Sequence, residues 1–185
     1  MEYVQSAWDA DLLLETGFPA VLARVMSLCS GLMQPDDNSK ETVSLALGLV
    51  NIALEAGGSA LSTLAPVVAF LKGEMCRNLL RTSHSSDLEV LSKSLRVVFN
   101  LFSSIKNHMK VQLEVFLTSV HLRMLQSNSA SLDQKEVVLE SLLEFCREPS
   151  LMHDLYINYD CDVRCTSLFD SIMTELCKQA TPVRV

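Results

Sequence analysis

The chain has little glycine or proline and no cluster of basic residues. Its 185 residues include six Gly and five Pro, which is too few for a low-complexity or disordered chain. The formal net charge is −7, and the most closely spaced basic pairs, such as Lys106 with Lys110, stand one helical turn apart. Because nucleic acid binding needs clustered cations to neutralise phosphates, the sequence argues against nucleic acid as the main partner. We expect Lys106 and Lys110 to be ordinary solvated helix positions.

The sequence also lacks a long uninterrupted hydrophobic run. The most apolar stretch, residues 43–71, is broken by Glu55, by Gly57-Gly58 and by Pro66, so we predict no transmembrane segment. The first residues, MEYVQSAWDADLLLE, are acidic and lack the basic region and apolar core of a secretory signal. We therefore expect a cytosolic protein.

The six cysteines do not form the framework of a small disulfide-rich domain. Cys29, Cys76 and Cys146 stand inside apolar helical patterns, where a free thiol behaves as a small buried hydrophobe. A chain of this length without a signal peptide fits a reducing compartment.

No signature of catalysis or of a bound cofactor is present. The sequence contains no Gly-rich phosphate loop, no G-x-S-x-G elbow and no H-E-x-x-H pair. The four histidines, which we expect at surface or helix-end positions, are scattered: His84, His108, His121 and His153. The sequence thus predicts a protein that is not an enzyme and binds no cofactor.

Apolar residues recur at helical spacing along the whole chain. Gly57-Gly58 is a helix C-terminal signal, and Asp87 or Ser86 can cap the helix that follows them. The predicted helices cover residues 18–33, 40–56, 62–80, 88–108, 110–125, 133–147, 150–157 and 163–178. Helices of this length joined by short polar loops predict an all-α fold, an armadillo/HEAT-like α-solenoid of about eight helices. The apolar fraction of 49% indicates a well-filled core or faces that meet a partner.

One segment, Asn158-Tyr159-Asp160-Cys161-Asp162, requires a choice between metal binding and a structural role. Asn158, Asp160 and Asp162 occupy the first three ligand positions of an EF-hand loop, but Val163 and Phe169 stand where that loop needs Gly and Glu. We therefore predict no calcium site. A zinc or thiol site built from His153, Cys161, Cys165 and Cys177 remains a less favoured alternative, since a structural zinc site usually has two close ligand pairs.

The structural interpretation of the same segment is a corner between two helices. Asn158 tolerates the left-handed conformation that ends a helix, and Asp162 can cap the next helix while Asp160 adds favourable charge near its N-terminus. Tyr159 and Cys161 can pack as anchors of the corner.

The stretch from Leu155 to Asp162, with Cys165 and Leu168-Phe169 after it, resembles the HUS box of the large Arf guanine-nucleotide exchange factors. HUS denotes homology upstream of the Sec-seven catalytic domain. Further similarity to the Golgi, brefeldin A-resistance branch lies in the segments Glu74-Met75-Cys76-Arg77, Ser94-Leu95-Arg96-Val97, Gln112-Leu113-Glu114 and Lys178-Gln179-Ala180-Thr181-Pro182-Val183. Ser167 and Asp170 depart from the pattern, which would have Asn and Glu. The resemblance covers residues 17–183 and leaves residues 1–16 as a tail or linker.

The resemblance implies an armadillo-like HUS domain that lacks the catalytic domain of the exchange factor. It implies association with the N-terminal dimerisation and cyclophilin-binding domain of the same family, supported by the box residues Asn158, Tyr159, Asp160, Cys161 and Asp162. It also implies control of exchange, and peripheral recruitment to Golgi membranes, with a membrane-bound small GTPase as a possible recruiter. A generic helical adaptor without this role is the alternative function.

Overall fold

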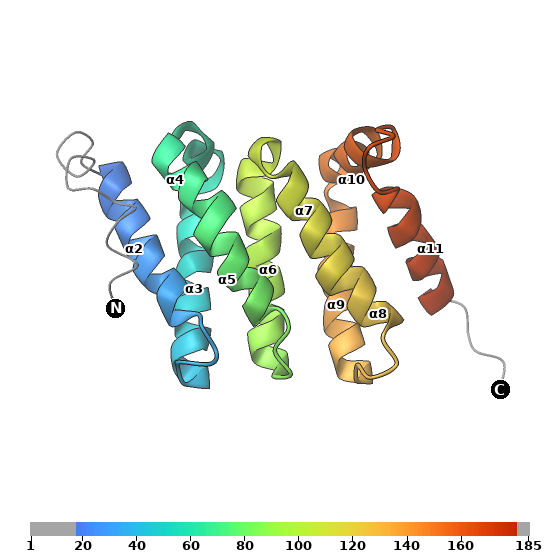
Figure 1. The fold of residues 1–185 in the computed structure, drawn as a ribbon, viewed down its shortest axis with the longest axis horizontal. Coiled ribbons are helices and arrows are strands. Elements are labelled where there is room, and N and C mark those ends of the chain that lie inside the picture. Colours follow the sequence, from blue (N-terminus) through green and yellow to red (C-terminus); the bar gives the residue numbers. More distant parts are fainter. Residues whose placement is uncertain (1–17, 181–185) are drawn as a thin grey trace.

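The computed structural model describes residues 18–180, and every regular element within this range is a helix (Figure 1). The predicted tail, residues 1–16, lies outside the described residues, as do Gly17 and the last residues, 181–183, of the predicted domain. The domain limits that we expect from the sequence therefore stay a prediction.

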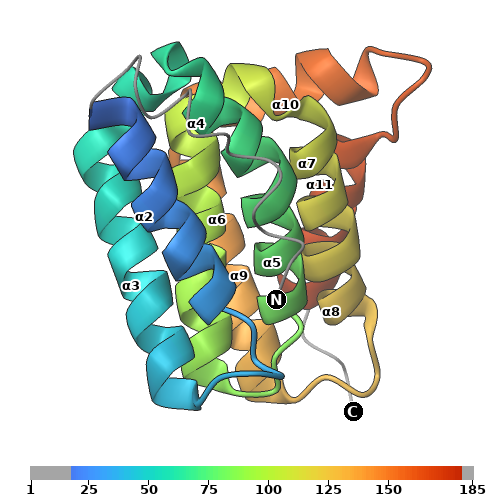
Figure 2. The same ribbon diagram turned by 60° about the vertical axis from the view of Figure 1, so that its left-hand side comes forward.

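The helices form two layers that extend along one axis. In one layer α3 (Lys40–Gly57) packs on α6 (Leu88–Ile105), which packs on α9 (Leu132–Arg147). The other layer begins with α2 (Phe18–Leu32) at one end and finishes with α11 (Leu168–Ala180) at the other (Figures 1 and 2). This arrangement confirms the predicted all-α, solenoid-like fold, while the finer likeness to armadillo or HEAT repeats stays a prediction.

Short helical segments complete these layers and join end to end into longer rods. Three rods contain a π-helical turn, in which the backbone bonds run from residue i to i+5. They are α4 (Ala65–Phe70), η2 (Leu71–Met75) and α5 (Cys76–Thr82); α7 (Lys110–Phe116), η4 (Leu117–Leu122) and α8 (Arg123–Gln126); and α10 (Pro149–Leu155) with η5 (Tyr156–Asp160). Between residues 18 and 180 the elements make eight rods, the number predicted from the sequence.

Several helix ends follow from residues recognised in the sequence. Asp87 caps α6, because its carboxylate accepts from the backbone N–H groups of Glu89 and Val90 at 3.0 and 3.1 Å. α3 ends at Gly57, and Gly58 has a φ of +48°, a conformation that favours glycine.

Other predicted helix ends are displaced by a few residues. The segment from Gly58 to Thr63, part of which we predicted as α-helix, is a 3-10 turn named η1, and Lys106–His108 is a second, η3. The helix predicted from residue 133 begins at Leu132, since the capping side chain is that of Ser131, which accepts from Gln134 N–H. The helix predicted from residue 163 begins only at Leu168.

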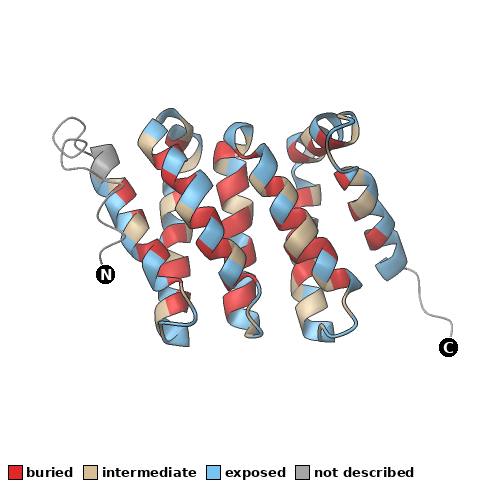
Figure 3. Ribbon diagram, in the orientation of Figure 1, coloured by how far each residue is buried: buried red, intermediate tan, exposed pale blue. Residues whose placement is uncertain are grey.

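The core is one cluster of buried apolar residues contributed by the helices of both layers, and Figure 3 marks the buried positions in red along these helices. Cys29 and Cys76 are buried as predicted, whereas Cys146 is only half-buried. His121 is also buried, so its predicted surface or helix-end position is wrong. Its Nε2 lies 3.0 Å from Ser141 Oγ, and burial lowers the pKa of the imidazole to about 4. His121 is therefore a neutral core residue.

α3 with the following 3-10 turn is the one described segment that is long and apolar enough to cross a membrane by length and composition alone. The most apolar 18-residue stretch of this segment, Lys40–Thr63, has a mean hydropathy of 1.4, and 33% of that stretch is buried in the fold. The core helix of a soluble protein meets the same two criteria. The α-helical part of the segment ends at Gly57, where the sequence predicts a helix end.

Candidate functional site

The Asn158–Asp162 motif lies where α10 and η5 end and the chain turns toward α11. The backbone N–H of Cys161 donates to the carbonyl of Tyr156 at 3.1 Å, which closes the π-helical turn. No described non-glycine residue has a positive φ. The predicted left-handed helix end at Asn158 is therefore wrong: Asn158 lies within η5, and the helix ends at Asp160.

Tyr159 attaches this helix end to α7. Its side chain is buried, and its hydroxyl donates to the backbone carbonyl of Lys110 at 2.5 Å. The Lys110 ammonium lies 5.6 Å from the centre of the Tyr159 ring, within the range of a cation–π contact. Burial, with the nearby Glu114 carboxylate, raises the pKa of the phenol well above its usual range. Tyr159 is thus an anchor of the corner, as predicted.

Asp160 supplies the cap of α11. Its two carboxylate oxygens accept from the backbone N–H groups of Phe169 and Asp170 at 2.8 and 3.0 Å. These are the second and third residues of α11, whose N–H groups have no partner inside the helix. We expected Asp162 to cap this helix and Asp160 only to add charge, so the structure corrects the assignment. A side chain from the preceding rod caps α11 across the intervening loop.

Asp162 instead holds the loop that leads to α11. Its carboxylate accepts from the backbone N–H and Nε of Arg164, both at 3.1 Å, and from Lys110 Nζ at 3.2 Å. Arg164, with Lys110, holds the pKa of this carboxyl well below its usual range. The Cys165 N–H closes the turn on the Asp162 carbonyl at 2.9 Å. Asp162 is therefore charged and fully engaged at neutral pH.

Glu114 provides a further attachment of this loop to α7. Its carboxylate accepts from the backbone N–H of Thr166 at 3.3 Å and from the hydroxyl of the same residue. Glu114 and Lys110 lie one turn apart on α7. The loop between Asp160 and α11 is thus held at both ends by one helix.

Local sequence patterns indicate little about these α7 partners. We expected Lys110 to be a solvated position, and Glu114 appeared only within a segment that resembled the exchange factors. The residues that they bind lie about fifty positions later in the chain. A long-range ion pair leaves no local periodic signal, so only the tertiary structure shows it.

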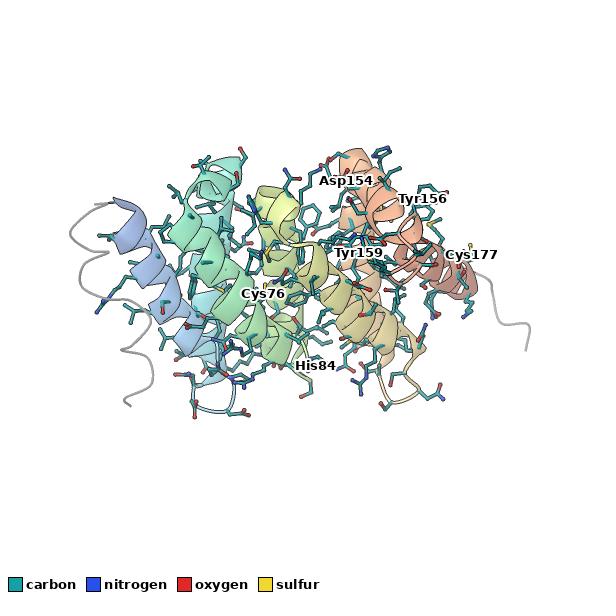
Figure 4. The ribbon with its side chains drawn as sticks, turned by 45° about the horizontal axis from the view of Figure 1, so that its top comes forward. Cys76, His84, Asp154, Tyr156, Tyr159 and Cys177 are labelled. Carbon is teal, nitrogen blue, oxygen red and sulfur yellow. The ribbon has the colours of Figure 1, made fainter. Side chains whose placement is uncertain are left out.

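The corner presents apolar side chains to solvent on this fixed frame. Tyr156 and Ile157 are half-exposed, and Val163 is 100% exposed between the two engaged residues Asp162 and Arg164. The Tyr156 ring meets Phe169 of α11 edge to face, with centroids 5.7 Å apart. In Figure 4, Tyr156 lies near the C-terminal edge, and Tyr159 lies further inside. We name Tyr156, Ile157 and Val163 the corner surface.

Asn158 and Cys161 do not anchor the corner. Cys161 is exposed, so its predicted role as an apolar anchor is wrong. Asn158 lines a pocket of about 210 Å³ beside the corner. This pocket is smaller than typical small-molecule sites, which have roughly 300–1,000 Å³. Its other lining residues are Lys106, Asn107, Lys110, Leu113, Leu151, Asp154, Leu155 and Tyr159.

The carboxylates of the corner are engaged by N–H donors rather than arranged around a cation. The carboxylates of Asp160 and Asp162 accept hydrogen bonds from N–H groups. A lone pair that accepts a hydrogen bond cannot coordinate calcium at the same time. Among residues 18–180 no three His, Cys, Asp or Glu side chains lie close enough together to hold a metal ion. His153, Cys161, Cys165 and Cys177 are thus not brought together as a zinc site.

Comparison with known proteins gives the wider context of this corner. Residues 20–168 match the family described as "Mon2/Sec7/BIG1-like, HUS domain". The chain is 36% identical over 139 residues to the ARF guanine-nucleotide exchange factor GNOM of Arabidopsis thaliana, covering 75% of this chain and 10% of the relative. It is 34% identical over 151 residues to the Golgi-specific brefeldin A-resistance guanine nucleotide exchange factor 1 homolog of Caenorhabditis elegans, covering 78% and 8%.

A relative with a different name has a similar level of identity to this chain. The human brefeldin A-inhibited guanine nucleotide-exchange protein 1 is 32% identical over 148 residues, which cover 79% of this chain and 8% of the relative. The chain thus spans about a tenth or less of the length of the relatives that it matches.

Proposed function

The chain belongs to the HUS-domain family of the large Arf guanine-nucleotide exchange factors, and from this we propose that it serves as a docking module for the N-terminal dimerisation domain of such a factor. The HUS domain is the non-catalytic region upstream of the catalytic domain, so the chain itself is not the exchange enzyme. The corner surface carries the proposal, because it places exposed apolar side chains on a rigid frame.

The geometry supports a docking role for the corner rather than a chemical one. Both carboxylates of the motif are bonded within the chain. Asp160 accepts from the N-terminus of α11, and Asp162 accepts from Arg164 and Lys110. What remains for a partner is the apolar corner surface and the small pocket lined by Asn158. Pre-ordered apolar groups lower the entropic cost of association. The motif Asn158–Asp162 therefore shapes the docking surface. Its two carboxylates affect docking indirectly, because they hold the backbone of the corner in place.

We also propose that docking supports recruitment of the exchange factor to Golgi membranes and the control of exchange. The name of the nematode relative includes "Golgi-specific", which supports this location. The net charge of −7 disfavours direct adsorption to anionic lipids. Recruitment is then peripheral, through the dimerisation domain or a membrane-bound small GTPase.

The proposal is tested by titrating the N-terminal dimerisation and cyclophilin-binding domain with the chain in a calorimeter. Val163→Asp and Ile157→Asp should each weaken binding roughly ten- to a hundredfold, since burying one such side chain contributes about 1.5–3 kcal/mol. Leu132→Asp is the matched control, because Leu132 is 84% exposed at the start of α9. It should leave the affinity unchanged.

Asp160→Ala and Asp162→Ala should weaken binding only as far as they loosen the corner, so thermal melts accompany both titrations. Unchanged affinity in both corner-surface variants would show that the corner is not part of the interface. A folded chain that binds no domain of an exchange factor would favour the alternative, a helical adaptor for other partners.

A further inference from the structure

A groove of about 540 Å³ lies on the outer side of α3, beside α6. α3 also packs on α2 and α6, and Figure 2 shows the three helices side by side. The apolar side of the groove consists of Leu45, Leu49 and Ile52, which recur at intervals of four and three residues and therefore form one stripe. These side chains keep 47–64% of their surface exposed. We name this site, with the charged residues described next, the α3 groove.

The charged side of the α3 groove is balanced and internally paired. The Glu89 carboxylate lies 2.8 Å from Lys93 Nζ and 3.4 Å from Lys40 Nζ, and Ser44 donates to it at 2.8 Å. With Glu41, the groove contains two Lys and two Glu, whose charges sum to zero, whereas the whole chain has a net charge of −7. Repulsion opposes the association of two copies of an acidic chain, and a charge-balanced face avoids it.

Gly48 leaves an open position in the apolar stripe. A methyl group added at Gly48 would meet no atom of the described residues, 18–180, within 4 Å. Glycine weakens the interior of a helix relative to alanine, and no described neighbour requires its small size here. A glycine of this kind fits a place where a group from another molecule approaches the backbone closely.

An antiparallel pair of α3 helices from two copies of the chain fills this position. About a twofold axis between Gly48 and Leu49, Leu49 of each copy lies over Gly48 of the other, and Leu45 lies against Ile52. The N-terminus of each α3 then lies beside the C-terminus of the other, so the two helix dipoles attract. A parallel pair would place Gly48 against Gly48, which leaves a hole. The groove is thus complementary to itself in the antiparallel arrangement.

We propose that two copies of this chain associate through the α3 groove, as an antiparallel, twofold pair of α3 helices with Leu49 of each copy seated at Gly48 of the other. The contact is one helix wide, at the small end of specific protein interfaces, so we expect a dissociation constant in the micromolar range. The corner lies at the other end of the row of helices (Figure 1). The inference therefore goes beyond the docking function proposed above and does not depend on it.

Sedimentation equilibrium of the whole chain, from micromolar to millimolar concentrations, measures the association. Leu49→Asp and Ile52→Asp should each weaken the dimer roughly a hundredfold or more, since a twofold contact contains every substitution twice. Leu143→Asp is the matched control, because Leu143 is 49% exposed on α9, in the same layer but outside the groove. It should leave the dissociation constant unchanged.

Gly48→Leu separates the dimer contact from the stability of the fold. The new side chain starts in open space within one chain, and leucine is the better helix former, so the Tm should stay equal or rise. In the dimer it occupies the place of Leu49 from the other copy, so association should be lost. Gly31→Leu is the matched control, since a methyl group added at Gly31 of α2 also meets no described atom within 4 Å.

A mixing experiment tests the antiparallel register. Leu45→Glu and Ile52→Lys should each be monomeric alone, and an equal mixture of the two should dimerise again. The recovery follows because position 45 of one copy lies against position 52 of the other, where the two new charges attract. Circular dichroism on each variant confirms that the helices are folded.

A chain that stays monomeric at the highest concentration would overturn the proposal, as would a dimer that tolerates Gly48→Leu or a mixture that remains monomeric. A monomeric chain whose binding to the N-terminal domain is abolished by Leu49→Asp would also overturn it, because that domain would then occupy the groove. Val163→Asp should leave the dimer intact, so failure of docking and failure of self-association can be told apart.

Discussion

Removing the Asp160 carboxylate should release the start of α11 without unfolding the rest of the solenoid. In Asp160→Ala the N–H groups of Phe169 and Asp170 lose their acceptors, which now lie at 2.8 and 3.0 Å. A helix N-cap contributes about 1 kcal/mol and at most about 2. For a chain of this size about 1 kcal/mol corresponds to roughly 2–4 °C in Tm, so we expect a Tm lower by about 2–8 °C.

The local effect should be larger than the global one, and hydrogen exchange measures it. The amide protons of Phe169 and Asp170 should exchange roughly tenfold faster in Asp160→Ala, since about 1.4 kcal/mol corresponds to a factor of ten. Asp160→Asn keeps an acceptor without the charge, so the exchange rates of these two amides should lie between those of the unmodified chain and those of Asp160→Ala. Asp37→Ala is the matched control, because Asp37 is an exposed loop carboxylate. Unchanged exchange at both amides, with a Tm equal to that of the control, would refute the assignment of Asp160 as the cap.

Three further predictions follow from other contacts. Burial lowers the pKa of His121 to about 4, whereas a histidine in the unfolded chain is protonated below about pH 6.5. The free energy of unfolding, measured by urea titration, should therefore fall by up to about 3 kcal/mol as the pH is lowered from about 6.5 to about 4. His121→Gln should reduce this dependence on pH. Tyr159→Phe removes the hydrogen bond to the Lys110 carbonyl and should lower the free energy of unfolding by about 1 kcal/mol in urea, with an unchanged value arguing against that bond. Glu114→Ala frees Thr166 and should accelerate tryptic cleavage after Arg164, whereas Glu136→Ala, at an exposed position on α9, should not.

Local sequence signals predicted most of the helices because their determinants lie within a few residues. Asp87 caps the helix that directly follows it, and Gly58 adopts the positive φ that its residue type permits. The helix predicted from residue 163 begins five residues later, at Leu168, because its cap is not local. Asp160 lies eight residues before Leu168, and a rule that searches the preceding position selects Asp162 instead.

The exposed residues of the site were harder to predict than the buried ones. Tyr159 is large and amphipathic, so a buried anchor with a bonded hydroxyl was a sound expectation. Cys161 and Val163 are both apolar, yet both are exposed because the loop that contains them is held by Asp162 and Glu114. His121 shows the reverse: a polar residue enters the core because Ser141, from another helix, offers a partner.

The π-helical turns have a consequence for how this chain varies among its relatives. Each turn contains one residue more than an α-helical path, so it rotates the residues that follow by about 100° about the helix axis. At η2, η4 and η5 a single-residue deletion can be absorbed by reversion to a regular α-helix. A deletion elsewhere in the same rods turns the apolar stripe away from the core. We expect single-residue gaps in alignments of homologous HUS domains to fall at these three turns, within helices rather than only in loops.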